Sequence, residues 1–542
     1  MVTDEATPQP AAPEVGPDQK AAAAPDVSAA EAAVLGLALS GGGVRAALFS
    51  LGVVVGLIAT GCHRRVRCIA SVSGGSILNA ALAHGDRLAG LSDVTAFEPL
   101  ASNLAASMAS RGVFAFSLRT VGSAAWYLAR VVARAIVPLA IGVPLMLAKL
   151  ADVLRDDFKL DLSQFDYRSL PWEALGWVML ASLLISALLS RGLFQEARFG
   201  SVLSSVASHR GRLNVEEWGK KGKGPDVMHV LVATDLLSGQ PMYFSNKFIY
   251  CRPYGWSTPK NIGTAEALYS SAAFPGVFPP KTLRTKRLSF QNGDMPGPLP
   301  PILRLADGGV YNNLGNDWFE ILKRQSRMSP PLLWRFGELD VEPSAIEPKN
   351  VIIVNAGAPS RRVRWLFPFT TLARIMSVLY DNTVQPRVKL IQNDELPLID
   401  IRETPLKLAT RLAERQNDLS SPAYELMTKL QDRTDDFWAD FTRDTAGTPT
   451  KLTGAGRRTA ARLMLHGYLS SIILLYSRFD GQLPERIEGE AYFLKLIDEE
   501  PPRATSARRR AFAPEVRSAV AGEPVVESGA GLEVAAGHPV QP

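Results

Sequence analysis

Ser73 has the surroundings expected of an enzyme nucleophile. It lies in the segment Ser-Val-Ser-Gly-Gly (71–75), which follows an apolar run at 66–72 and precedes a helical stretch. This order predicts a tight strand-to-helix turn that lifts a hydroxyl clear of the sheet, and small neighbours are needed because the helix leaves close to the strand. Ser71 stands where glycine is commonest in such turns. By itself, the segment is also typical of a Ser/Gly turn that caps a helix.

A serine nucleophile needs a base, and the sequence offers an aspartate rather than a histidine. None of the six histidines occupies a motif-like position: His63 lies in a Gly-Cys-His-Arg-Arg turn and His538 lies in the C-terminal tail. Asp307, in Leu-Ala-Asp-Gly-Gly (305–309), ends an apolar strand at a glycine turn that exposes its carboxylate beside other loops. Asp307 is therefore the candidate base, although Asp-Gly-Gly also occurs in ordinary turns.

A glycine-rich loop provides backbone donors. The segment Ser-Gly-Gly-Gly-Val-Arg-Ala (40–46) follows a predicted strand and opens a predicted helix. Its N–H groups, without shielding by Cβ atoms, can converge on a negative oxygen at the helix N-terminus. The loop is either an oxyanion hole or a phosphate cradle. It is not a Walker loop, because the Gly-Lys-Ser/Thr ending is missing, and no acid follows at the distance that binds a ribose.

The elements around these segments predict an α/β fold. An apolar strand from Val34, a helix at about 44–60, a second strand at 66–72 and a helix after Ser73 follow one another. This order predicts a parallel sheet with right-handed crossovers. Later strand-like runs also end in polar or glycine turns, and ligand sites in open α/β sheets gather at the carboxyl ends of strands. These later runs are 227–236, the strand before Asp307, and 351–357.

In combination, these segments resemble the patatin and cytosolic phospholipase A2 families. The glycine loop, the serine elbow and the later Asp-Gly-Gly occur in the order of those families, which use a Ser-Asp dyad. Ala-Thr-Asp-Leu-Leu-Ser-Gly (233–239) resembles the family's central strand end. Ser-Ser-Ala-Ala-Phe-Pro-Gly-Val-Phe-Pro-Pro (270–280) resembles its Ala-Ser-x-x-x-Pro-x-x-Phe-Pro-Pro block. The resemblance implies a patatin-like three-layer α/β sandwich with a mainly parallel central sheet.

The resemblance also implies roles for single residues. Asp307 would take the proton of Ser73 as the hydroxyl attacks an ester carbonyl, while the N–H groups of Gly42 and Gly43, assisted by Gly41, hold the oxyanion. Arg45 binds a lipid phosphate, braces the loop or is an ordinary surface arginine of the helix. A base that works near neutral pH needs a partly desolvated site. No His-Glu-x-x-His, Cys-x-x-Cys or EF-hand pattern occurs, so neither a metal ion nor a cofactor is expected.

Composition favours a membrane surface as the acidic partner. The net charge is +6 and the sequence pI is near 9.1, yet the basic residues form no stripe of the nucleic-acid-binding type. The three cysteines cannot all pair and lack metal-site spacing, which favours a reducing compartment. The first thirty residues have neither a basic nor an apolar region of signal-peptide type.

Two uncharged runs interrupt the region of resemblance and predict a helical hairpin. The runs at 135–148 and 174–190 are each shorter than the roughly 20 residues that span a bilayer, but both can lengthen into their flanks. A membrane hairpin and a hairpin buried in the protein both fit this pattern. Arginines on the outer flanks predict a cytoplasmic catalytic domain on the cytoplasmic membrane, since two crossings return the chain to one side. These arginines are Arg111, Arg119, Arg130, Arg134, Arg191, Arg198 and Arg210.

The sequence therefore predicts a membrane-associated lipid acyl hydrolase of phospholipase A or lysophospholipase type, acting on phospholipid or another lipid ester. A transacylase and a catalytically inactive, partner-binding membrane protein are the alternatives. A basic-aromatic segment at 361–369 suits the headgroup level of a membrane. The predicted regions are a disordered tail (1–33), the first catalytic part (34–110), the hydrophobic insertion (111–200), the second catalytic part (201–360), a helical C-terminal region (361–500) and a disordered tail (501–542).

Overall fold

The computed structural model describes residues 33–113, 125, 129, 196, 199–200, 213–220, 222–275, 278–326, 346–357 and 368–498. The predicted disordered tails, nearly all of the hydrophobic insertion and most of the basic-aromatic segment lie outside these residues. The predicted hairpin is therefore neither seen nor contradicted. Within the described ranges, no helix combines the length and the apolar character that a membrane crossing needs.

The central sheet is parallel in one half and antiparallel in the other. Along the sheet the strand order is β11-β10-β1-β2-β3-β4-β5-β6-β8, and β9 pairs with both β3 and β7. Pairing is parallel from β11 to β3 and antiparallel for the remaining strands. The strands are β1 Leu35–Leu39, β2 Val66–Val72, β3 Met228–Asp235, β4 Pro241–Ser245, β5 Ile249–Cys251, β6 Gly255–Ser257, β7 Lys281–Arg284, β8 Gln291–Asn292, β9 Ile302–Asp307, β10 Val351–Asn355 and β11 Leu398–Asp400.

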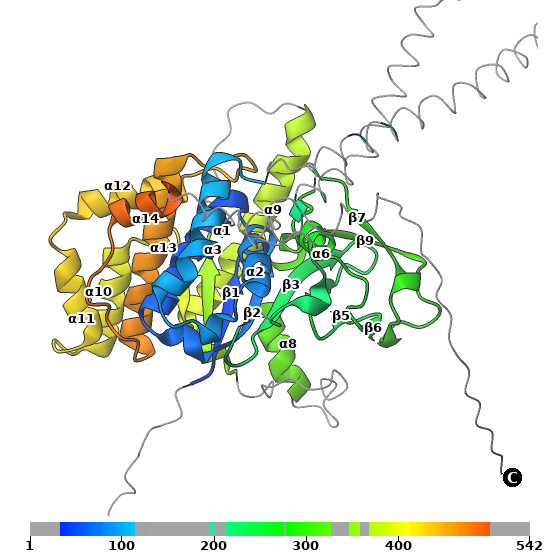
Figure 1. The fold of residues 1–542 in the computed structure, drawn as a ribbon, viewed down its shortest axis with the longest axis horizontal. Helices are drawn as coiled ribbons and strands as arrows, with labels where there is room; N and C mark the ends of the chain where they lie inside the picture. Colours follow the sequence, from blue (N-terminus) through cyan, green and yellow to red (C-terminus); the bar gives the residue numbers. More distant parts are fainter. Residues whose placement is uncertain are drawn as a thin grey trace, which may run out of the picture. The chain divides into compact units, whose positions relative to one another are not determined.

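Helices cover both faces of the parallel half, which makes three layers (Figure 1). Successive strand residues point into two different cores: Leu37 and Leu39 pack in one, and Ala38 packs in the other. Because both faces are buried, β1 is a continuous apolar run rather than an alternating one, and every residue of β3 is buried. One face carries α1 Gly43–Ala59, α2 Ser73–His84, α3 Val94–Ser110 and α6 Thr264–Ser271, and the other carries α8 Asp317–Ser326 and α9 Pro368–Asn393.

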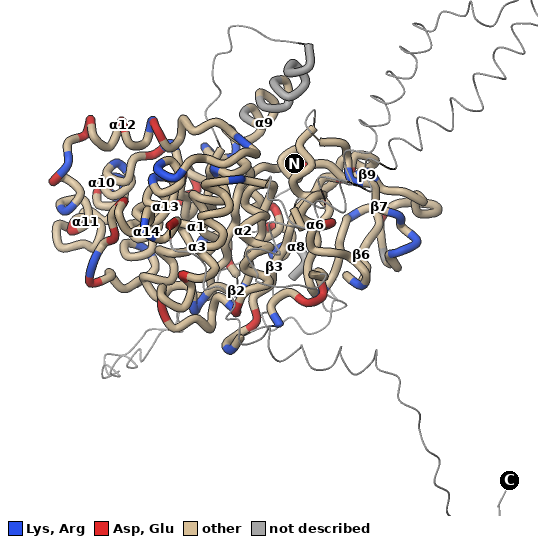
Figure 2. The backbone as a smooth tube through the Cα atoms, turned by 45° about the horizontal axis from the view of Figure 1, so that its top comes forward, with Lys and Arg blue, Asp and Glu red and all other residues tan. Residues whose placement is uncertain are grey.

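The C-terminal helices belong to the same packed body as the sheet. These are α10 Pro405–Gln416, α11 Pro422–Leu430, α12 Asp435–Ala446, α13 Arg457–Arg478 and α14 Glu490–Asp498. Helix α13 lies against α1 so closely that a Cβ on Gly52 would come within 1.9 Å of the Met464 carbonyl oxygen. Acidic and basic residues are interspersed along α10, α11 and α12 (Figure 2). The glycine loop at the start of α1 therefore lies close to C-terminal segments.

Candidate active site

Ser73 occupies a strained turn between β2 and α2. Its φ angle is 50°, in the left-handed region that side chains other than glycine rarely adopt. A Cβ on Gly74 would lie 2.2 Å from the Gly43 carbonyl oxygen, and one on Gly75 would lie 2.8 Å from the Ser40 carbonyl oxygen. Only glycine fits at both positions. The turn has the geometry that the sequence predicts for a nucleophile elbow.

Ser71, the departure from the usual elbow sequence, is accommodated by hydrogen bonds. Its side chain is fully buried, and its Oγ accepts from Asn79 Nδ2 at 2.8 Å and from Ser76 Oγ at 3.0 Å. It also donates to the Val230 carbonyl oxygen at 3.3 Å. A buried hydroxyl costs little when it is satisfied in this way. The extra hydroxyl is therefore part of a polar network beneath the elbow.

The same network reaches the backbone of the nucleophile. Ser271 Oγ accepts the Ser73 N–H at 3.2 Å and bonds to Ser76 Oγ at 2.9 Å. His229 Nδ1 bonds to Asn79 Oδ1 at 2.7 Å, and burial lowers the pKa of His229 to about 3, which keeps the ring neutral. Sequence reasoning missed this hydrogen-bond network beneath the elbow. The only sequence signal for the network was Ser271, which lies inside the block that resembles the family.

Asp307 lies at the end of β9, where the antiparallel pair Ala233–Asp307 brings it to the carboxyl end of β3. The side chain is 1% exposed, and Oδ1 accepts the Gly309 N–H at 2.8 Å. Oδ2 is also buried and accepts no well-aligned hydrogen bond from the described residues. Burial raises the pKa of Asp307 to about 6, while interactions with the Ser73 side chain and the Gly309 amide oppose the increase. The fold thus brings together the two predicted residues, with one carboxylate oxygen left for a proton.

The three glycines of the loop do not have equivalent amides. The Gly41 N–H donates to the Asn313 carbonyl oxygen at 3.0 Å, so this amide already has an acceptor, and the assisting role of Gly41 stays a prediction. Gly42 and Gly43 have φ angles of 146° and 62°, and their N–H groups bond to no other described residue. Their amides remain the candidate oxyanion donors. Asn313, which sequence reasoning missed, couples the loop to the turn after Asp307.

Arg45 braces the loop from behind. Its side chain is 1% exposed, and the guanidinium donates to the carbonyl oxygens of Ala356 at 2.8 Å and Thr448 at 2.6 Å. Arg45 is therefore not a surface arginine, and its contacts favour bracing over binding of a lipid phosphate. The bonds tie the start of α1 to β10 and to the segment that follows α12.

Ser73, Asp307 and the loop glycines open into a cavity of about 330 Å³, here called the acyl pocket. A volume of this size, with mostly apolar walls and a few polar groups at one end, is typical of a small-ligand site. The apolar part of its lining consists of Ile77, Val113, Phe199, Ala272, Phe274, Tyr380 and Leu452.

Tyr380, from α9, is a further residue that sequence reasoning missed. Its ring meets Phe274 edge-on at a centroid distance of 5.4 Å, and its hydroxyl is buried without a hydrogen-bond partner among the described residues. Burial and the nearby Asp307 carboxylate both raise the pKa of Tyr380, so the phenol stays protonated. No local pattern marks this tyrosine, because α9 reaches the pocket only through the tertiary fold.

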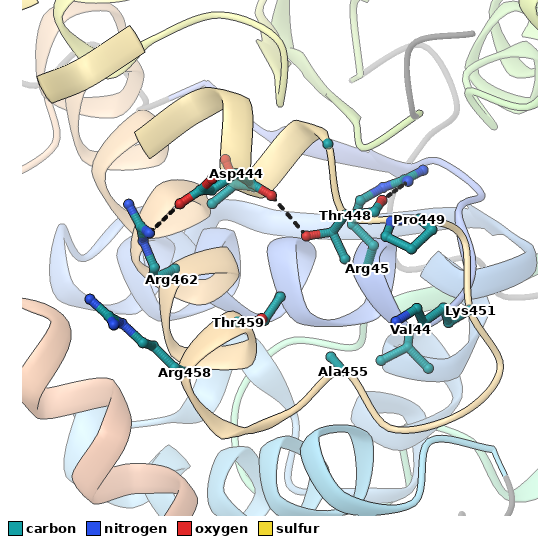
Figure 3. Close-up of a pocket in the computed structure, with 12 residues that line it drawn as sticks. Val44, Arg45, Asp444, Thr448, Pro449, Lys451, Ala455, Arg458, Thr459 and Arg462 are labelled. Atoms are coloured by element: carbon teal, nitrogen blue, oxygen red, sulfur yellow. Dashed lines mark hydrogen bonds and ion pairs between the residues drawn. The ribbon is translucent and has the colours of Figure 1, made fainter. Parts of the chain in front are cut away.

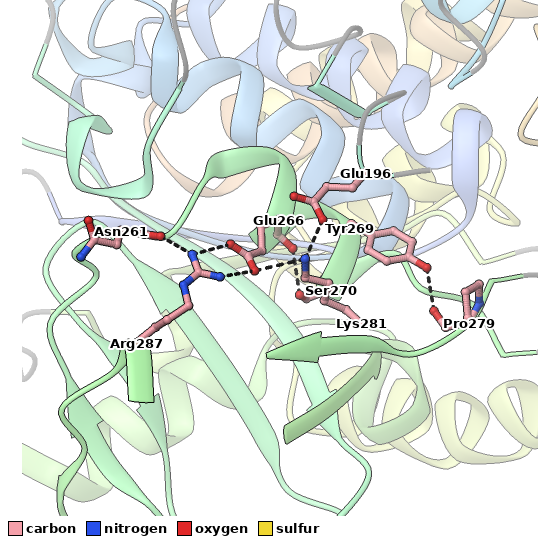
Figure 4. A network of polar contacts seen from close by, with 8 residues as sticks. All are labelled: Glu196, Asn261, Glu266, Tyr269, Ser270, Pro279, Lys281 and Arg287. Carbon is pink, nitrogen blue, oxygen red and sulfur yellow. Dashed lines mark hydrogen bonds and ion pairs between the residues drawn. The ribbon is translucent and has the colours of Figure 1, made fainter. Parts of the chain in front are cut away.

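A buried ionic network holds α6, the helix that ends at Ser271 (Figure 4). Glu266 bonds to Lys281 at 3.1 Å and to Arg287 at 2.9 Å, and Lys281 also bonds to Glu196 at 2.5 Å. Burial alone would raise the pKa of Glu266, but Lys281 and Arg287 outweigh it and lower the pKa below its ordinary value. Since Glu196 falls near the end of the predicted insertion, the chain returns from that segment beside the site.

Comparisons with known proteins agree with the sequence resemblance. The family model described as patatin-like phospholipase matches residues 37–316. The crystal structure of VipD from Legionella pneumophila is 14% identical, with 87% of this chain and 91% of that chain covered and a TM-score of 0.25. At that level of likeness, nothing about the present chain follows from VipD. No curated protein sequence matches this chain. No group of His, Cys, Asp or Glu side chains suited to a metal ion occurs in the described residues.

Proposed function

This chain belongs to the patatin-like phospholipase family, a family of lipid acyl hydrolases, and from that premise we propose that it cleaves lipid esters through Ser73 and Asp307. The observation that carries the proposal is the state of Asp307. Its carboxylate is buried beside the Ser73 side chain, and its pKa is raised to about 6, which suits a base that works near neutral pH.

In the proposed reaction, ionised Asp307 takes the proton of Ser73 as the Ser73 oxygen forms a bond to the ester carbonyl carbon. The N–H groups of Gly42 and Gly43 stabilise the negative oxygen of the tetrahedral intermediate. When the ester C–O bond breaks, Asp307 returns the proton to the leaving alcohol. Water then attacks the acyl-enzyme with Asp307 again acting as the base, which releases the fatty acid and restores Ser73.

The acyl pocket supports a lipid substrate drawn from a membrane. Val113 and Phe199 lie near the two ends of the predicted hydrophobic insertion (111–200), and both line this pocket. Phe199 also packs against Tyr269 and Phe278. Because both ends of the insertion meet at the pocket, we infer that the insertion holds the pocket entrance at the cytoplasmic membrane, with the catalytic domain on the cytoplasmic side. A buried hairpin is the alternative, and resistance of the full chain to carbonate extraction from membranes distinguishes the two.

The two other functions left open by the sequence have less support. The inactive, partner-binding protein was suggested by Ser71 in the elbow, and Ser71 is fully hydrogen-bonded beneath an intact turn. A transacylase uses the same acyl-enzyme and differs only in the acceptor. Product analysis with an added alcohol separates transfer from hydrolysis.

The test uses full-length protein in detergent or vesicles, with a fluorophosphonate probe and phospholipid substrates. We expect labelling at Ser73 and release of fatty acid, and the Ser73→Ala variant should lose both. Ser50→Ala is the matched control, because the Ser50 hydroxyl is buried in α1 without a hydrogen-bond partner in the described residues. Folded wild-type protein that neither labels nor releases fatty acid, or labelling that persists in Ser73→Ala, would contradict the proposal.

A further inference from the structure

A second pocket of about 610 Å³ lies behind the glycine loop, between α1, the segment after α12 and the start of α13 (Figure 3). Apart from Val44 and Arg45, its lining residues lie beyond residue 316, outside the range that matches the family. We call it the basic pocket. Its lining consists of Val44, Arg45, Asp444, Thr445, Gly447, Thr448, Pro449, Lys451, Ala455, Arg458, Thr459 and Arg462.

The lining of the basic pocket has an excess of positive charge. Arg45, Lys451, Arg458 and Arg462 are cationic, and Asp444 is the one carboxylate among the described lining residues. Asp444 forms an ion pair with Arg462 but is itself 62% exposed, so the pairing is well screened by water. Lys451 forms no ion pair with any other described residue.

The positive charges of Arg458 and Arg462 repel each other, which destabilises α13. They lie one turn apart on α13 and point from the same side of the helix (Figure 3), and like charges at this spacing destabilise a helix. Glu490 is 3.5 Å from Arg458 Nε, but the Arg458 side chain is 81% exposed. Arg462 Nε is buried and lacks a hydrogen-bond partner among the described residues. A bound anion would offset the repulsion between the two guanidinium groups.

The start of α13 adds to the attraction for an anion. Gly456 caps the helix without a side-chain hydrogen bond, and the first turn contains no acidic residue. The positive end of the helix dipole is therefore not compensated by a neighbouring carboxylate in that turn. The cavity, the cation cluster and the start of α13 all indicate an anionic ligand.

We propose that the basic pocket binds a phosphate group, carried either by a soluble phosphate ester or by the headgroup of an anionic lipid. Guanidinium groups match the geometry of phosphate oxygens and bind them with charge-assisted hydrogen bonds. The cavity is larger than a single phosphate ion needs, which leaves room for the group that carries the phosphate.

The ligand would be held against the back of the oxyanion loop. Lys451 lines the basic pocket, and its carbonyl oxygen accepts the Val44 N–H at 3.2 Å. Its neighbours Thr450 and Leu452 line the acyl pocket on the other side. The phosphate is thus separated from Ser73 by one strip of backbone. Because the site is defined by binding alone, it does not depend on the proposed hydrolase function.

The experiment measures binding to full-length Ser73→Ala protein, which prevents turnover. Inorganic phosphate is titrated by calorimetry, and phosphatidylcholine vesicles are compared with and without phosphatidic acid. Lys451→Ala combined with Arg458→Ala removes two exposed cations of the pocket, and Arg415→Ala combined with Lys429→Ala removes two cations outside its lining. Melting temperatures of both double variants verify that they fold.

We expect saturable binding that the pocket variant weakens at least about tenfold and the control variant leaves unchanged, because each charge-assisted hydrogen bond is strong. Binding of inorganic phosphate assigns a soluble phosphate ester, whereas a response only to phosphatidic acid assigns a lipid headgroup. The proposal is overturned if the protein binds neither probe, or if both double variants bind equally well.

Discussion

The acyl pocket and the basic pocket share a backbone strip, yet they are built in different ways. The functional groups of the acyl pocket lie in tight turns with unusual φ angles, as at Ser73 and Gly43, and Asp307 is almost fully buried. The basic pocket instead relies on long side chains such as Lys451 and Arg458, which reach in from the surface. Single substitutions should therefore change ester hydrolysis strongly in the acyl pocket and change phosphate affinity gradually in the basic pocket.

The largest difference is expected for Asp307→Asn. Loss of a general base should reduce ester hydrolysis by about 10²- to 10⁴-fold, without changing phosphate binding in the basic pocket. The comparison uses rates of fatty acid release together with phosphate titrations. Asp480→Asn, at an exposed position, should behave as wild type. A fall in phosphate binding equal to the fall in rate would show that the two pockets are not separate.

The Asp307→Asn variant should be more stable than the wild-type protein at neutral pH. Because the folded protein raises the pKa of Asp307 to about 6, the folded state binds this proton more tightly than the unfolded state. The carboxyl group therefore lowers stability as pH rises from about 4 to about 6, and Asn avoids that loss. Denaturant unfolding should show a gain of up to about 3 kcal/mol above pH 7. The gain should vanish below about pH 4.

Gly43→Ala tests the shared strip. The backbone φ angle of Gly43 is 62°, and a Cβ added there would lie 2.7 Å from the Lys451 carbonyl oxygen. Activity should fall about 10²- to 10³-fold, because an oxyanion donor is displaced. Phosphate binding should weaken as Lys451 moves. Gly61→Ala is the matched control, since Gly61 has a φ of 74° with no atom within 4 Å. It should lose about 1 kcal/mol of stability and keep both functions.

The pH dependence of kcat/KM in the wild-type enzyme tests the role of Asp307 in the acyl pocket without any mutation. Since Asp307 must be ionised to act as a base, kcat/KM should rise about tenfold per pH unit at low pH and level off above about 6. Phosphate binding is compared at one fixed pH, because the phosphate probe itself gains negative charge at about pH 6. An inflection near 4 would mean that Asp307 is not desolvated during catalysis.

Tyr380→Phe should have a moderate effect confined to the acyl pocket. The substitution keeps the ring that packs against Phe274 and removes only the unsatisfied hydroxyl. If that hydroxyl binds substrate, activity should fall by about three- to tenfold while the free protein becomes no less stable. Steady-state kinetics and the melting temperature together show whether the Tyr380 hydroxyl contributes to activity or to stability. A loss of stability with unchanged kinetics would assign Tyr380 to packing alone.

The smallest effect is expected for Asp444→Asn in the basic pocket. Removal of the carboxylate frees Arg462 from its ion pair, so phosphate affinity should increase by a few-fold. Asp440→Asn removes the same charge from α12 at an exposed position outside the pocket lining and should change affinity less. Hydrolysis should not respond to either variant. An unchanged affinity in Asp444→Asn would show that Asp444 does not compete with the anion.

Much of the candidate active site was predictable because its sequence signals are local. The turn at Ser73, the glycine loop and the strand that ends at Asp307 each require particular residues within a few positions, and those residues can be read in order along the chain. Ser71 shows what local patterns cannot predict. Its buried hydroxyl is satisfied by hydrogen bonds to Asn79 and to Val230 from a neighbouring strand, and no local sequence pattern connects these residues to Ser71.

The amino-acid order alone was sufficient for the α/β fold class and the family resemblance, because strand, turn and glycine patterns act over short distances. It also indicated Ser73 and Asp307 as the candidate pair. Only the folded chain revealed that Asn313 occupies the Gly41 amide, that Arg45 braces the loop and that α9 brings Tyr380 to the pocket. The basic pocket likewise joins residues some four hundred positions apart. Such contacts arise when buried elements pack, and packing depends on shape and hydrogen bonding across the whole core.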